Sequence, residues 1–90
     1  MKTKTGHTYI TRTPGVCGGE PVIQGSRISV RLIAGWYRMG RTADEILEYY
    51  PQLSLAKIYD ALSYYHDHRE EVDKSIEDDT EARLRKDFKL

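Results

Sequence analysis

Helix start and stop signals divide the middle of the chain into three short segments. Gly40 stands where a residue of left-handed geometry ends a helix, and Thr42 with Glu45 forms a T-x-x-E capping box that begins the next one. Pro51 biases the residue before it away from helical geometry, and Ser54 can cap the helix that follows. Helices joined by such short turns pack against one another, so the sequence predicts a three-helix core.

Apolar spacing supports helices over residues 30–39, 43–49 and 55–66. The third has one inward stripe, formed by Leu55, Ile58, Leu62 and Tyr65. The first has two adjoining stripes, formed by Ile33, Trp36 and Tyr37 and by Leu32, Trp36 and Met39. We therefore expect the first helix to be buried over a wide arc.

Short β-prone runs precede the helices. The polar residues 1–8 carry no regular pattern and are expected to be loose. Residues 9–12 form a run that stops at Pro14 and is typical of an edge strand. Residues 21–28 have turn residues at their centre, which indicates a small hairpin.

The helical pattern blurs at residues 66–68, where Asp67 and Glu70 can cap a fresh helix; one continuous helix is the alternative. The apolar positions of this last segment are Val72, Ile76, Leu84 and Phe88. The expected fold is mainly α, with a short N-terminal β-strand or hairpin, a three-helix helix-turn-helix core of the homeodomain-like or winged-helix-like kind, and a charged C-terminal helix. The helix-turn-helix domain would span residues 1–69, and the charged helix or tail residues 70–90.

Size and composition limit what this fold can do alone. A chain of 90 residues with a mean hydropathy of −0.65 has few side chains for a core, and a homodimer would supply the missing burial. Cys17 is the only cysteine, which excludes an internal disulfide and favours a cytoplasmic location. No apolar run approaches the roughly 18 residues of a membrane-spanning helix, so we expect no membrane contact.

The net charge of zero hides an asymmetry between the two parts of the chain. Residues 1–41 carry seven Lys or Arg against the single acid Glu20, whereas residues 42–90 carry seven bases and thirteen acids. This polarity suggests a basic face for a polyanion and an acidic face for something else. Two solvated halves that attract one another are the alternative.

The sequence PGVCGGEPVI at residues 14–23, followed by GSRISV at residues 25–30, resembles the prokaryotic family catalogued as domain of unknown function 433. The resemblance runs on to Leu62 and covers about residues 10–68. It implies a helix-turn-helix antitoxin of the VapB type, with a partner that resembles a PIN-type ribonuclease toxin. A stand-alone DNA-binding regulator and a module that binds only protein are the alternatives.

The helix-turn-helix interpretation makes residues 43–49 the supporting helix and residues 55–66 the recognition helix. Ser54, Lys57 and Asp60 would reach the bases of an operator. Phosphates would be held by four arginines, Arg27, Arg31, Arg38 and Arg41. A plain helical hairpin with a solvated outer face is the alternative.

Partner contacts are expected at two places. If Tyr65 faces the core, its neighbour Tyr64 faces outward and can contact a second copy or a partner. In the tail, arginines would pair with nuclease carboxylates while two apolar side chains anchor the contact; these residues are Arg83, Leu84, Arg85 and Phe88. A solvated terminal helix whose charges pair with one another is the alternative.

The other chemistry-bearing residues have simpler explanations. Gly18, Gly19 and Gly25 lack the Gly-Lys-Ser/Thr ending of a phosphate-binding loop, so tight turns explain them better. His66 and His68 are two residues apart, which on a helix points them in different directions and excludes a shared metal. We expect no enzyme, no metal and no cofactor.

Overall fold

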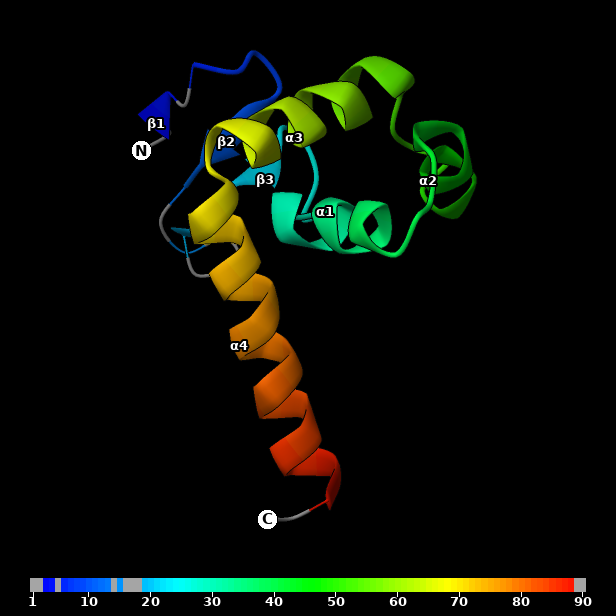
Figure 1. The fold of residues 1–90 in the computed structure, drawn as a ribbon. Helices are drawn as coiled ribbons and strands as arrows, with labels where there is room; N and C mark the ends of the chain where they lie inside the picture. Colours follow the sequence, from blue (N-terminus) through cyan, green and yellow to red (C-terminus); the bar gives the residue numbers. More distant parts are fainter. Residues whose placement is uncertain (1–2, 5, 14, 16–18, 89–90) are drawn as a thin grey trace.

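The computed structural model describes residues 3–4, 6–13, 15 and 19–88 of the chain, with side chains described for residues 6–13, 15 and 19–78. Cys17 and Gly18 lie outside the described residues. The order of elements is three short strands followed by four helices, as Figure 1 shows. The prediction of a mainly helical fold with a small N-terminal β-hairpin is confirmed.

The three strands form one antiparallel sheet in the order β1, β2, β3. These strands are β1 (Thr3–Lys4), β2 (Ile10–Arg12) and β3 (Val22–Ile23). The strand expected near residues 9–12 is present as β2, but its expected position at an edge is wrong. It is the central strand, because β1 pairs with it on one side and β3 on the other.

The turn after β3 reverses the chain toward the first helix. The Ile23 N–H donates to the Ile28 carbonyl oxygen at 2.9 Å, and Val22 forms a β-bridge with Ser29. The Ser26 hydroxyl donates to the Ile23 carbonyl oxygen at 2.8 Å and accepts from the Ile28 N–H. Gly25 at the turn has a φ of 78°, which glycine adopts without strain.

Three helices follow at the expected places: α1 (Val30–Arg38), α2 (Ala43–Tyr49) and α3 (Leu55–Asp67). Gly40 follows α1 with a φ of 91°. The Thr42 hydroxyl accepts from the Glu45 N–H at 3.2 Å and the Glu45 carboxylate accepts from the Thr42 N–H at 3.1 Å. That backbone hydrogen bond lowers the pKa of Glu45. The predicted capping box is confirmed.

Helix α4 (Arg69–Phe88) is separate from α3, so the alternative of one continuous helix is wrong. His68 leaves helical geometry with a φ of −127°, and its carbonyl oxygen accepts from the Val72 N–H at 3.0 Å. In Figure 1, the later turns of α4 lead away from the other helices. The radius of gyration, 13.3 Å, accordingly exceeds the value of about 12.2 Å for a compact chain of this length.

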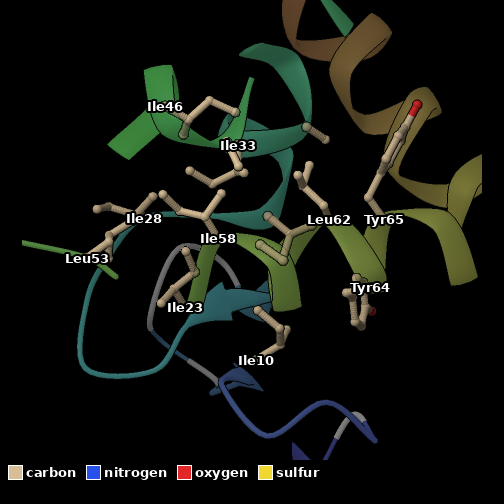
Figure 2. Close-up of a cluster of buried hydrophobic side chains, with 14 of the residues drawn as sticks. Ile10, Ile23, Ile28, Ile33, Ile46, Leu53, Ile58, Leu62, Tyr64 and Tyr65 are labelled. Carbon is tan, nitrogen blue, oxygen red and sulfur yellow. The ribbon is translucent and has the colours of Figure 1, made fainter. Parts of the chain in front are cut away.

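The core lies between the sheet and the first three helices, with isoleucines from both converging on Ile58 (Figure 2). Val72 of α4 closes one side of it. Only one stripe of α1 is buried, through Val30, Ile33 and Ala34. The expected wide arc of burial is therefore wrong, because α1 packs on its neighbours along one side and leaves Leu32 and Met39 43% and 68% exposed.

Candidate functional site

The outer surface of α3 has a different chemistry from the one expected of a recognition helix. Ser54 is exposed, and its hydroxyl accepts from the Lys57 N–H as the helix cap. Lys57 itself is half-buried. The most exposed large apolar residue of α3 is Tyr59, with Leu55 one turn before it. The outward side of α3 is therefore mainly uncharged.

Asp60 is half-buried, so its expected outward position on α3 is wrong, whereas its role in reading bases stays a prediction. Its Oδ2 accepts from the Tyr9 N–H at 2.7 Å, and its Oδ1 lies 3.4 Å from His7 Nδ1. His7 Nε2 in turn lies 3.1 Å from Asp67 Oδ2. A carboxylate that is 19% exposed requires such partners. Asp60 thus connects the N-terminal segment to α3. Tyr9 and Asp60 are 51 positions apart in the sequence, so no local pattern predicts this contact.

Three of the four expected phosphate-binding arginines form ion pairs within the chain. Arg31 lies 3.4 Å from Glu20 and Arg41 lies 3.8 Å from Glu45. Arg38 lies 3.4 Å from Asp73, as described below. Arg27 is exposed in the turn between β3 and α1. Phosphate binding by any of the three paired arginines would compete with a carboxylate that is already in place.

Asp73 fastens α4 to two other helices. Its Oδ1 accepts from the Tyr65 hydroxyl of α3 at 2.8 Å and lies 3.4 Å from the Arg38 guanidinium of α1. Burial and, after it, this hydrogen bond to Asp73 raise the pKa of Tyr65. The direction in which α4 leaves the globule is therefore fixed by side chains from three helices.

Tyr64 is 2% exposed, so the expectation that it faces outward is wrong. Its ring packs edge-on against His7 at 5.4 Å between centroids and stacks on His68 at 4.2 Å. Burial and the nearby Glu71 raise its pKa. Both tyrosines are buried because the N-terminal segment covers one side of the α3 end, while α1 and α4 cover the other. Figure 2 shows the two rings at one end of the core.

An exposed apolar surface lies instead on α1 and α2. We define the α1–α2 patch as Leu32, Trp36, Met39 and Tyr49. The Trp36 and Tyr49 rings lie 4.6 Å apart, and Trp36 Nε1 donates to the Tyr50 hydroxyl at 3.0 Å. This hydrogen bond holds the indole in place beside apolar side chains that the rest of the chain leaves exposed.

The expected partner residues Arg83, Leu84, Arg85 and Phe88 lie in the last turns of α4, and their side chains are outside the described part of the chain. Among the described residues, no three His, Cys, Asp or Glu side chains are grouped so as to hold a metal ion. None of the helices in the described ranges is both long and apolar enough to cross a membrane.

The family model described as "Protein of unknown function (DUF433)" matches residues 10–65. The chain belongs to the DUF433 family. The chain shares 35% sequence identity with a DUF433 member protein from Anabaena variabilis ATCC 29413, and comparison with the crystal structure of that protein gives a TM-score of 0.71. The alignment covers 76% of this chain and 67% of the Anabaena one. None of the curated proteins matches the chain.

The DUF433 match runs from the first residue of β2 to Tyr65 near the end of α3. It therefore includes β2, β3, the three-helix core and the α1–α2 patch, whereas β1 precedes it. Helix α4, including Asp73, follows the matched segment. The common DUF433 core and the projecting helix are thus separate parts of this molecule.

Proposed function

We propose that this DUF433 chain is an antitoxin that acts as a homodimer and neutralises a PIN-like ribonuclease through α4. The main support is the course of α4. Val72 and Ile76 pack against the core, whereas the backbone beyond them leads away from the other helices (Figure 1). The part of α4 that does not pack on its own globule presents surface to another protein. The family resemblance indicates the class of that partner.

The chemistry of the last turns suits a nuclease of this class. Arg83 and Arg85 are cations that can pair with the clustered carboxylates by which such enzymes hold metal ions. Leu84 and Phe88 supply apolar contact between and after them. Bound in this way, the last turns of α4 would compete with both the metal ions and the RNA for the nuclease active site.

Growth rescue tests this proposal in cells. A PIN-like ribonuclease encoded by the neighbouring reading frame should arrest growth when expressed alone. Co-expression of the full chain should restore growth, because the complex removes active nuclease. A chain with Arg83→Glu and Arg85→Glu should not restore it. Equal rescue by both chains would contradict the proposed contact.

Operator binding is the second part of the proposed antitoxin role, and it depends on few cations. Lys57 at the start of α3 is half-buried and Arg27 before α1 is exposed. Arg31, Arg38 and Arg41 each lie beside a carboxylate of the chain. Fluorescence anisotropy with a duplex from upstream of the reading frame measures this binding. We expect affinity to fall only modestly between about 50 and about 200 mM salt, because few counterions are released when few phosphates are neutralised.

The surface of α2 and α3 favours a second candidate function, a module that binds only protein. Asp44 and Glu48 are exposed on α2 and would repel phosphates, whereas Leu55 and Tyr59 on α3 are uncharged. The same anisotropy experiment separates the candidates. A protein-only module gives no DNA binding even at low salt and still rescues growth.

A further inference from the structure

We infer that the α1–α2 patch is the surface through which two copies of this chain pair, with α2 of one copy antiparallel to α2 of the other. The inference rests on the homodimer of the proposed function and assigns its contact surface. It is independent of the contact between α4 and a nuclease.

The centre of the α1–α2 patch has the composition of an interface core. Leu32, Trp36 and Met39 lie at i, i+4 and i+7, so they follow one another along a single side of α1. Tyr49 extends this stripe onto α2 through its ring contact with Trp36. A fixed aromatic pair beside exposed aliphatic side chains is typical of the residues that carry most of an interface's binding energy.

The charged side chains beside this apolar centre follow a fixed order along the chain, with a cation before α2 and carboxylates within it. Glu45, Glu48 and Tyr49 fall at i, i+3 and i+4 of α2, so they share one side of that helix. Arg41 precedes the helix and reaches this side through its ion pair with Glu45. The cation stands before the first turn and Glu48 stands in the last turn. Arg41 and Glu45 lie 3.8 Å apart with both side chains 43% exposed, which is a loose pair that another carboxylate can replace. No described residue forms an ion pair with Glu48.

This order of charges identifies a second copy as the occupant. A two-fold axis through the patch reverses α2, so the beginning of one α2 faces the end of the other. When this axis crosses α2 midway between Arg41 and Glu48, Arg41 of each copy faces Glu48 of the other. DNA does not fit the same surface, because Glu45 and Glu48 would repel its phosphates.

Sedimentation equilibrium of the full chain, without DNA or nuclease, tests the surface. We expect the wild type to dimerise and Leu32→Glu or Met39→Glu to raise the dimer Kd by at least about tenfold, as expected for a charge placed in an interface core. Tyr59→Glu is the matched control, because Tyr59 is a more exposed apolar residue on α3 than Leu32 is on α1. Its Kd should equal that of the wild type, and circular dichroism should show all variants folded.

A charge exchange tests the antiparallel arrangement. Arg41→Glu and Glu48→Arg should each weaken dimerisation, since each variant places like charges opposite one another in its own homodimer. An equimolar mixture of the two should associate as the wild type does. In the mixed dimer, both cross pairs again join opposite charges.

Three outcomes overturn the inference. If the wild type dimerises and the Leu32 and Met39 variants dimerise equally well, the homodimer stands but its surface lies elsewhere. If the mixture of charge variants stays monomeric, the antiparallel arrangement is wrong. If the wild type is monomeric at about 100 µM, the homodimer itself is wrong, whereas growth rescue still reports separately on nuclease neutralisation.

Discussion

A single carboxylate, Asp60, connects the N-terminal segment to α3. Asp60→Ala removes the acceptor of the Tyr9 N–H and the partner of His7 Nδ1. Leaving such a donor without an acceptor in a half-buried place costs about 1–3 kcal/mol, so we expect urea denaturation to show a loss of about 2 kcal/mol in the free energy of unfolding.

Ser63→Ala is the control for this variant, because Ser63 is exposed on the same helix. Its free energy of unfolding should stay within about 0.5 kcal/mol of the wild type. An Asp60→Ala chain as stable as the Ser63→Ala chain would contradict the connecting role of Asp60.

The capping box makes stability depend on pH in the acid range. The Thr42 N–H lowers the pKa of Glu45 below its ordinary value of 4.5. A carboxylate whose folded pKa is below its unfolded pKa stabilises the fold above about pH 4.5, and this contribution is lost as the pH falls through the folded pKa. Thermal melts of wild type and Glu45→Gln from pH 7 to pH 3 should therefore converge at the acid end. A constant difference across this range would show that the charge of Glu45 plays no part.

At the scale of elements, Asp73 sets the position of α4. Asp73→Ala removes the acceptor of the Tyr65 hydroxyl and the partner of Arg38. We expect faster amide hydrogen exchange over residues 72–78, corresponding to a local loss of about 1 kcal/mol. Lys74→Ala, at the exposed neighbouring position, should leave the exchange unchanged. Equal exchange in both variants would mean that Val72 and Ile76 alone hold the helix.

The sequence predicted the elements well wherever the signal is local. Gly40, the Thr42–Glu45 box and Ser54 act within one turn of the chain, and the helices begin and end beside them. Contacts between residues far apart in the sequence could not be predicted from such local signals. Only tertiary packing determines which stripe of α1 is buried, and it also brings Tyr9 to Asp60.

The candidate site was harder to predict than the fold. Side-chain type suggested Asp60 and Tyr64 as surface contacts. In the structure, Asp60 bonds to the N-terminal segment and Tyr64 is buried within the same chain. A spacing of i, i+4 and i+7 identified the Leu32–Trp36–Met39 stripe without indicating that it stays exposed. Amphipathic spacing reports that a surface is apolar, and the same pattern serves a core and an interface.

At the scale of the whole molecule, we expect a folded globule that ends near residue 78 and a projecting end of α4. A chain of residues 1–78 keeps Asp73 and Ile76 and should melt within a few degrees of the full chain. A chain of residues 1–72 loses both contacts and should melt lower by at least about 5 °C, the shift that a loss of about 1 kcal/mol gives in a domain of this size. Circular dichroism follows the melting of each chain. Equal melting temperatures of the two truncated chains would show that residues 73–78 add nothing to the stability of the globule, which would contradict the division at residue 78.

Inhibition of the purified nuclease shows whether the projecting end of α4 neutralises it. Cleavage of a labelled RNA by the PIN-like ribonuclease from the neighbouring reading frame is measured against increasing amounts of the full chain and of residues 1–78. We predict that the full chain abolishes cleavage at equimolar amounts and that the folded 1–78 chain leaves it unchanged. Full inhibition by residues 1–78 would contradict neutralisation through the end of α4 and place the inhibitory surface on the helical core.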